Sequence, residues 1–260
     1  MNNNLTKVFS VLTFLLASNG FAAGAPVTHQ FQGGQPASAS QVNENFQELA
    51  DRISDIPAPT VTASYDYRQY LSNVSSKVFS VRGSTTTCDT ETYTYARTQN
   101  GDNTDITVTR TATDNGTPCY MFIQYFTATP TQYELHASDS IDPITSDVTG
   151  HDRFEPTQIF DINPMQLGRL YSFHSENFYT PRVGTELSNG FMLRDITVIA
   201  VEDVTVPAGT FTGCLKIHRI SHSRSSTSPS LTWHCPTVGE VKYIYISGSN
   251  VIKELTSYTP

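Results

Sequence analysis

The chain has 260 residues, of which 38% are hydrophobic, 11% aromatic and 15% charged. That length allows one large β domain with an appendage, and it is enough to bury a hydrophobic core. Lysine and arginine together number 16 against 24 acidic residues, so the net charge is −8. An acidic chain without clustered basic residues argues against binding to the phosphate backbone of nucleic acid. The 13 tyrosines and 14 phenylalanines argue against an intrinsically disordered polymer.

The N-terminus has the pattern of an export signal. Lys7 precedes an apolar run from Val8 to Ala17, and Gly20-Phe21-Ala22 follows as a small-residue cleavage site. We expect residues 1–22 to be a signal peptide and residues 23–38 an extended lead-in. The apolar run is too short to cross about 30 Å of hydrocarbon, and no transmembrane segment is expected in the mature chain. The predicted location is therefore periplasmic or extracellular.

A helix is predicted directly after this lead-in. Ser38 and Gln41 have the spacing of a capping box, in which each side chain bonds to the backbone N–H of the other residue. Pro57-Ala58-Pro59 ends the pattern, so the helical segment is residues 39–57 and the β domain is residues 58–260. Its apolar residues follow the heptad spacing of a coiled-coil seam, and they are Val42, Phe46, Leu49, Ile53 and Ile56.

Two roles for this helix remain open. It could dock on its own β domain, or it could associate with other copies of the chain. Phenylalanine and isoleucine in the seam favour three strands, which predicts a homotrimer. Residues 36–56 also resemble the short coiled-coil stub that follows the signal peptide in secreted trimeric proteins of Gram-negative bacteria. The resemblance implies self-association and names no activity.

Four cysteines, Cys88, Cys119, Cys214 and Cys235, occur without a Cys-x-x-Cys pair. An even number of cysteines in an exported chain predicts two disulfides, and the spacings do not fit a zinc site. Three pairings are possible. We favour Cys88–Cys119 and Cys214–Cys235, because the second pair flanks one expected hairpin and the first brackets a tyrosine-rich region.

From Tyr65 onward the sequence reads as β-strands separated by short turns. Asn-Gly pairs at residues 100–101 and 115–116 are strong hairpin signals. Residues 138–168 contain several prolines and Gly150, and we expect them to be irregular. The prediction is an all-β antiparallel meander of about a dozen short strands.

No catalytic residue, metal ligand or cofactor is predicted, and the chain is not expected to be an enzyme. Motifs for nucleotide binding, metalloproteases, serine hydrolases and calcium loops are absent from the sequence. If Cys214 faces Cys235, paired residue numbers sum to 449, and His218 and His234 then lie on opposite faces of the hairpin. These two histidines and His222 therefore cannot converge on a metal.

Weaker candidates are two acidic groups and one aromatic group. The acidic residues could hold a hard cation weakly, although solvated turns explain them better. The tyrosines could stack on sugars or apolar ligands, although amphipathic strands explain them better. The acidic groups are Asp102, Asn103 and Asp105, and Asp139, Asp142 and Asp147; the aromatic group is Tyr65, Tyr67, Tyr70, Tyr93 and Tyr95.

Residues 165–258 carry a recurrent pattern. Val204-Thr205-Val206-Pro207-Ala208-Gly209-Thr210-Phe211 precedes Trp233-His234-Cys235-Pro236, Val238-Gly239-Glu240-Val241-Lys242 and Glu254-Leu255. The pattern resembles that of a broad group of bacterial exported β-domains. The resemblance implies a strongly curved antiparallel sheet like that of the periplasmic lipoprotein carriers. The expected fold is therefore a half-barrel or sandwich with a short N-terminal helix.

Two functions fit these features. The first is a non-enzymatic binding or carrier-type domain that holds an apolar or amphipathic ligand in a concave sheet. The second is a structural or cell-surface interaction protein that is oligomerised through residues 39–57. A continuous apolar cavity in the structure would favour the first function, and a filled interior with a protruding helix would favour the second.

Overall fold

The computed structural model describes residues 29, 38–54, 63–83, 88–224, 226–246 and 251–260. The predicted signal peptide, most of the lead-in and Ile56 lie outside these residues, as do the side chains of Leu49 and Ile53. The chain divides into two compact units, residues 1–60 and residues 61–260. We describe each unit separately, and the predicted domain boundaries stay predictions.

The first unit contains helix α1, Ala39–Ser54, where a helix was predicted. The capping box is present: Ser38 Oγ accepts from Gln41 N at 3.3 Å, and Ser38 N donates to Gln41 Oε1 at 3.4 Å. His29 is held against this helix by two hydrogen bonds between its backbone and the Asn45 side chain, at 3.0 and 2.7 Å. Phe46 is 67% exposed, and Val42 is half-buried.

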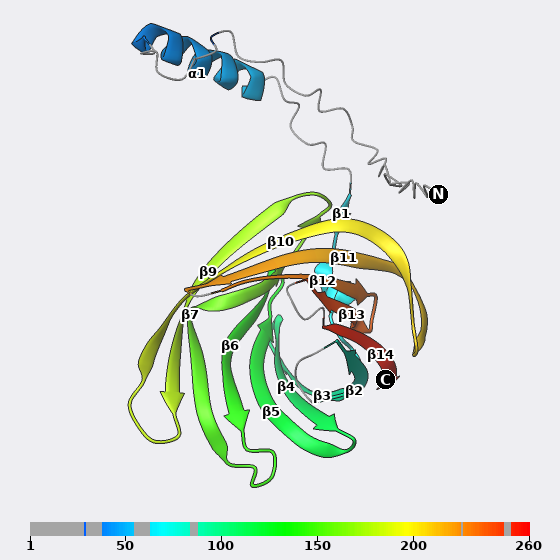
Figure 1. Ribbon diagram of the computed structural model, residues 1–260. Coiled ribbons are helices and arrows are strands. Elements are labelled where there is room, and N and C mark those ends of the chain that lie inside the picture. Colours follow the sequence, from blue (N-terminus) through cyan, green and yellow to red (C-terminus); the bar gives the residue numbers. More distant parts are fainter. Residues whose placement is uncertain (1–28, 30–37, 55–62, 84–87, 225, 247–250) are drawn as a thin grey trace, which may run out of the picture. The chain divides into compact units, whose positions relative to one another are not determined.

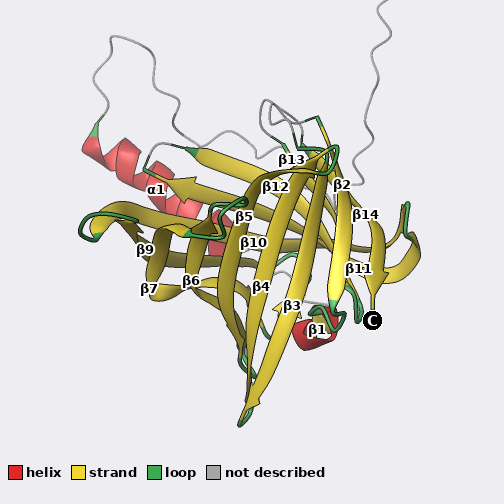
Figure 2. Cartoon of the chain, turned by 90° about the horizontal axis from the view of Figure 1, so that it is seen from below, coloured by secondary structure: helices red, strands yellow, loops and turns green. Residues whose placement is uncertain are grey.

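The second unit is a closed antiparallel β-barrel (Figure 1). Its twelve strands follow the order β10-β11-β12-β13-β14-β2-β3-β4-β5-β6-β7-β9 around the wall, and β1 and β8 form a separate two-stranded sheet. The strands are long and tilted (Figure 2). The elements are β1 (Ser64–Tyr65), 3-10 helix η1 (Tyr67–Tyr70), β2 (Ser76–Arg82), β3 (Thr90–Asn100), β4 (Asn103–Asp114), β5 (Thr117–Ala128), β6 (Gln132–Ile141), β7 (Val148–Ile162), β8 (Met165–Gln166), β9 (Leu170–Pro181), β10 (Leu187–Val206), β11 (Gly209–Ser223), β12 (Thr227–Cys235), β13 (Gly239–Tyr245) and β14 (Ile252–Thr259).

The all-β class is correct, but the prediction of a half-barrel or sandwich is wrong. The barrel closes because β9 pairs with β10 on one side and with β7 on the other, while β14 pairs with β2. A sheet closed in this way has no edge strand. The implied likeness to an open half-barrel carrier is therefore corrected as well.

The prediction that residues 138–168 are irregular is also wrong. Strand β6 continues to Ile141, and β7 occupies most of the remainder. Pro156 is accommodated at an irregularity of the β6–β7 ladder, since pairing stops at Arg153 and resumes at Gln158. Gly150 is needed for close packing, because a Cβ atom there would lie 2.5 Å from the Tyr179 hydroxyl. These two breaker residues therefore shape a strand.

The predicted hairpins are confirmed. Asn100 pairs with Asn103 around Gly101, and Asp114 pairs with Thr117. In the second turn Asn115 has φ 48° and Gly116 has φ 82°, as a type I′ turn requires. The β11–β12 register is also the predicted one, because His218 faces Leu231 and Leu215 faces His234.

The structure contains two disulfides, Cys88–Cys119 and Cys214–Cys235. These are the pairings favoured above. The second disulfide links the neighbouring strands β11 and β12, with Cα atoms 4.1 Å apart. Structural disulfides persist in oxidising compartments, so their presence favours a location outside the cytoplasm.

The recurrent C-terminal pattern supplies one hydrophobic cluster. Its buried members come from the end of hairpin β10–β11 and from β2, β12, β13 and β14. The backbone N–H of Ala208 donates to the carbonyl of Leu255 at 2.9 Å, which fastens the hairpin end to β14. The pattern therefore acts as scaffold here. The buried members are Phe79, Val204, Val206, Cys214, Trp233, Cys235, Val238, Val241 and Leu255.

We expect reduction of the two disulfides to lower the free energy of unfolding. Loss of a native disulfide from a secreted domain costs about 2–5 kcal/mol, because the unfolded chain gains freedom. Urea unfolding with and without reductant measures this loss. Thiol titration of the denatured, unreduced protein is the control, and four free thiols would contradict the prediction.

Candidate functional site

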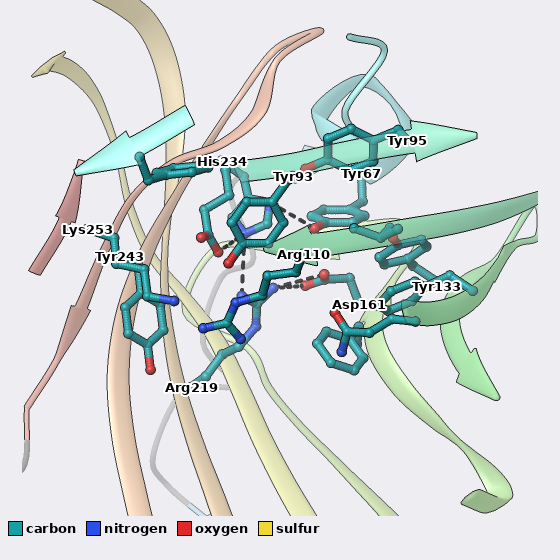
Figure 3. A pocket seen from close by; sticks show the side chains of 16 residues that line it. Tyr67, Tyr93, Tyr95, Arg110, Tyr133, Asp161, Arg219, His234, Tyr243 and Lys253 are labelled. Atoms are coloured by element: carbon teal, nitrogen blue, oxygen red, sulfur yellow. Dashed lines mark hydrogen bonds and ion pairs between the residues drawn. The ribbon is translucent and has the colours of Figure 1, made fainter. Parts of the chain in front are cut away.

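A cavity of about 340 Å³ lies inside the barrel (Figure 3). Its volume is at the lower end of the range for small-molecule sites, about 300–1,000 Å³. Aromatic and charged side chains dominate its wall, and they come from most strands of the barrel. The lining residues are Tyr67, Phe79, Tyr93, Tyr95, Val108, Arg110, Gln124, Phe126, Tyr133, Phe160, Asp161, Arg219, His234, Glu240, Tyr243 and Lys253.

Apolar and charged side chains lie close together on the cavity wall. Along β4, the apolar residues Ile106 and Val108 are followed on the same face by Arg110. The first two belong to a hydrophobic cluster with Phe126, against which Phe160 packs. Residues two apart on a strand are separated by about 7 Å, so the wall changes character within the length of a small organic molecule.

One charged group at the wall is a buried ion pair. Arg219 Nη2 donates to both carboxylate oxygens of Asp161, at 2.7 and 2.8 Å. Arg219 Nη1 donates to Thr232 Oγ1 at 2.9 Å. Burial raises the pKa of Asp161, and the guanidinium of Arg219 opposes this effect. Removal of one partner from such a pair leaves an uncompensated buried charge, so the two residues depend on each other.

His234 extends this group toward the end of the barrel that carries η1. Its Nε2 lies 3.4 Å from Arg219 Nη1, and its Nδ1 lies 3.0 Å from the Tyr67 hydroxyl. Arginine can only donate, so Nε2 is the acceptor and Nδ1–H donates to Tyr67. Burial, together with the charges of Arg219 and Lys77, holds the pKa of His234 well below its usual value. The ring is therefore neutral, and both nitrogens are engaged by the protein.

The second charged group is centred on Glu91, whose side chain is 3% exposed. Arg110 donates to it twice, at 2.6 and 3.0 Å, and Lys253 Nζ donates at 2.7 Å. The hydroxyls of Tyr93 and Tyr120 donate at 2.8 and 2.6 Å. Burial alone would raise the pKa of Glu91, but Lys253 and Arg110 hold it at about 2.

Two further cations are buried behind the wall. Lys77 is 1% exposed, and its Nζ donates to the backbone carbonyl of Glu240 at 3.0 Å. Burial lowers the pKa of Lys77 to about 7. Arg194 is 9% exposed, and its guanidinium lies 3.8 Å from the ring centre of Phe160. Burial lowers the pKa of Arg194 to about 9.

The segment that carries η1 contacts two hydrophobic clusters of the barrel. Leu71 packs against the cluster that contains Tyr67 and Tyr70 and also against the cluster that contains Phe126. Backbone bonds join Asn73 and Gln69 to Thr237, and Arg97 Nη2 donates to the carbonyls of Ser72 and Val74. Residues 67–74 are therefore anchored to β3 and to the β12–β13 turn, and they place Tyr67 at the cavity.

Some of the candidate residues from the sequence analysis lie together at the cavity. Of the tyrosine group, Tyr67, Tyr93 and Tyr95 line the cavity, whereas Tyr65 and Tyr70 pack in a core cluster. His234 lines the cavity, and its face of the hairpin excludes His218, as predicted. Sequence reasoning assigned no role to Glu91, Arg110, Asp161, Arg219 or Lys253, because isolated polar residues in alternating strands look solvent-facing.

Several residues of the two acidic groups bind other parts of the protein. Asp105 accepts from Thr127 at 2.9 Å, and Asp142 accepts from the backbone N–H groups of Ile144 and Thr145. Asp147 pairs with Arg182 at 2.9 Å. Among the described residues, no group of three or more His, Cys, Asp or Glu side chains is arranged to hold a metal. In the same part of the chain, no helix has the length and apolar character needed to span a membrane.

Comparison with protein-family models finds no matching family, and comparison with curated proteins finds no match. Among solved structures, the chain resembles one from Bacteroides fragilis NCTC 9343, described as a proposed exported protein with a YmcC-like fold. Identity is 10%, coverage is 76% of this chain and 100% of that chain, and the TM-score is 0.49. A proposed lipoprotein from Parabacteroides distasonis ATCC 8503 has 13% identity, the same coverage and a TM-score of 0.47. Similarity at this level assigns neither activity nor ligand.

The depressed pKa of Glu91 predicts a pH-dependent contribution to stability. The pKa falls from 4.5 to about 2 on folding, so the contribution is complete above pH 4.5 and is lost as the pH falls toward 2. A pKa shift of this size corresponds to a contribution of about 3 kcal/mol to the free energy of unfolding. We expect Glu91→Gln to lower the free energy of unfolding by about that amount at pH 7, with the deficit shrinking between pH 4.5 and 2.

Chemical denaturation of both proteins across this pH range measures the deficit. Glu176→Gln is the matched control, because Glu176 is exposed on β9. It should change stability by less than about 0.5 kcal/mol. A Glu91→Gln deficit that is constant from pH 7 to pH 2 would refute the prediction.

Proposed function

We propose that the chain is an exported, non-enzymatic binding or carrier-type protein that holds a small amphipathic ligand inside the β-barrel. The observation that carries the proposal is the cavity of about 340 Å³, whose wall combines aromatic and charged side chains. Binding pockets combine apolar walls with a few placed polar groups in this way. The two disulfides support the exported location, either periplasmic or extracellular.

The engagement of the polar groups supports binding in place of catalysis. A general base needs an available lone pair within reach of its substrate. His234 is neutral, but its Nε2 faces Arg219 and its Nδ1 faces Tyr67. The carboxylates of Asp161 and Glu91 are each held by arginine. These side chains orient one another, which suits a preorganised binding wall.

A second candidate function is self-association through the N-terminal helix, as a structural or cell-surface interaction protein. The exposure of Phe46, at 67%, favours it, since a large apolar residue at a seam position gains from burial against another copy. The expected assembly is a homotrimer. The two functions are compatible, because they use different units of the chain.

The binding proposal is tested by filling the cavity. Gln124 lines the cavity, whereas its neighbour Tyr125 on β5 is 36% exposed. We expect phenylnaphthylamine, a neutral aromatic fluorophore, to bind the wild type saturably at one site. Gln124→Trp should weaken this binding about tenfold or more, because the larger ring occupies the ligand's space. Tyr125→Trp on the same strand is the control and should leave it unchanged.

Fluorescence titration gives both affinities, and circular dichroism checks that each variant is folded. Absence of saturable binding, or equal affinities for wild type and a folded Gln124→Trp variant, would refute the binding proposal.

The trimer is tested by a charge at the seam. Phe46→Asp would place a carboxylate in an apolar interface, which is costly, so the assembly should dissociate to monomers. Ser40→Asp adds the same charge outside the seam and should leave the trimer intact. Sedimentation velocity distinguishes the species. A wild type that stays monomeric at tens of micromolar would contradict the trimer.

A further inference from the structure

The region around the cavity carries more positive than negative groups. Among the described residues, those that line it or pack directly behind its wall include five cations, Lys77, Arg110, Arg194, Arg219 and Lys253. The carboxylates in the same region are Glu91, Asp161 and Glu240. The balance is 5 − 3 = +2, or +1 when Lys77 is neutral. Arg97 is left out, because it lines a neighbouring cavity together with Asp102.

The excess of positive charge around the cavity contrasts with the net charge of the whole chain, which is −8. A buried cation is costly unless an anion or several hydrogen-bond acceptors compensate it. Each buried cation around the cavity must therefore have an anion or hydrogen-bond acceptors that compensate its charge.

In the Glu91 group, the single carboxylate of Glu91 compensates only one of the two positive charges of Arg110 and Lys253. Glu91 Oε1 accepts from Arg110 and Tyr120, and Oε2 accepts from Tyr93, Arg110 and Lys253. Both oxygens are thus fully used, and a single negative charge faces two positive charges. Lys253 has three N–H donors, of which Glu91 takes one. Glu240 is another carboxylate of the cavity wall. Its charge raises the pKa of both Lys253 and Lys77, and its Oε2 lies 3.8 Å from the neutral ring of His234.

Arg194 gives a second, independent sign of uncompensated positive charge. Its Nη2 donates to Gln158 Oε1 at 3.1 Å, but its Nε and Nη1 are buried without a hydrogen-bond partner. No ion pair joins Arg194 to a carboxylate of the described residues, and Asp161 is already held by Arg219. Phe160, the ring beneath Arg194, belongs to the cavity wall.

We propose that the ligand of the cavity is an anion: a small aromatic or other amphipathic molecule whose acidic oxygens bind Lys253 and Arg110, with its apolar part against Phe126 and Phe160. This inference rests on the proposed function and names the ligand class for the same site. Sulfonate, carboxylate and phosphate share the required chemistry, since each accepts charge-assisted hydrogen bonds.

The position of the two cations supports this assignment. Arg110, Lys253 and Tyr243 line the cavity of about 340 Å³ and also an adjoining one of about 280 Å³. In Figure 3, Lys253 lies beside Tyr243, and Arg110 projects toward the middle of the cavity. Lys253 Nζ is 5.3 Å from the Tyr243 ring centre. The charged end of the ligand would therefore lie where the two cavities meet.

Two fluorophores with the same ring system separate charge from shape. Anilinonaphthalene sulfonate carries an acidic group, and phenylnaphthylamine lacks it. We expect the sulfonate to bind the wild type about tenfold more tightly than the neutral compound, as one added charge-assisted contact implies. The net charge of −8 disfavours general attraction of the sulfonate to the protein surface.

Three variants locate the effect. Lys253→Met should weaken sulfonate binding about tenfold and alter phenylnaphthylamine binding by a much smaller factor. Glu240→Gln removes a negative charge from the wall and should tighten sulfonate binding severalfold at a single site. Because partly unfolded protein also binds this fluorophore, near-ultraviolet circular dichroism is used to check that the variant keeps its native packing. Lys242→Met is the control: Lys242 pairs with Glu254 at 2.9 Å and does not line the cavity. It should alter neither affinity.

The outcomes distinguish the two proposals. If phenylnaphthylamine does not bind, the proposed binding function fails. If phenylnaphthylamine binds and the sulfonate binds no more tightly, the function stands and the anion inference is overturned. The anion inference is also overturned if Lys253→Met changes both affinities equally, or if Glu240→Gln does not tighten sulfonate binding. A tighter sulfonate complex that responds in opposite directions to the two variants supports the inference.

Discussion

The interior of this protein exists because β9 completes the ladder of hydrogen bonds around the barrel. β9 pairs with β7 through residues 176–181 and with β10 through residues 170–179. Without these pairings, β7 and β10 would be edge strands, and their inner faces would be open to water. Closure removes both edges, and inner side chains such as Glu91 and His234 are buried. Burial lowers the pKa of His234, whereas it would raise the pKa of Glu91, which is low only because Lys253 and Arg110 lie beside it.

A closed barrel does not by itself require a charged interior. An eight-stranded barrel is filled by its own side chains, whereas twelve strands enclose more space. That space could be packed with apolar residues, and replacement of a buried ion pair by such residues is often neutral or stabilising. Here it holds Asp161–Arg219 and the Glu91 group instead. Stability alone does not explain these charges, whereas the proposed role in binding would.

The sequence predicts the local features well, because turns, caps and hairpin registers depend on neighbouring residues. Asn115-Gly116 sets its turn, Ser38 and Gln41 form the cap, and the Cys214–Cys235 pairing places His218 and His234 on opposite faces of the hairpin. Closure is different, since β2 and β14 meet from opposite ends of the domain. The site was missed for a related reason: in an alternating strand, Arg110 looks like an outward-facing polar residue, and only a wet or ligand-filled interior reverses that expectation.

The C-terminal pattern was interpreted as scaffold, and the structure shows that it has a second task. Adjacent residues of β12 point to opposite sides of the strand. Trp233 belongs to the hydrophobic cluster that fastens the β10–β11 hairpin, while His234 lines the cavity. The same division recurs in β13, where Val241 joins the cluster and Glu240 lines the cavity. Because these pairs are adjacent in the chain, the packing that fixes Trp233 and Val241 also fixes the positions of His234 and Glu240. The pattern therefore couples the stability of the hairpin to the geometry of the charged wall.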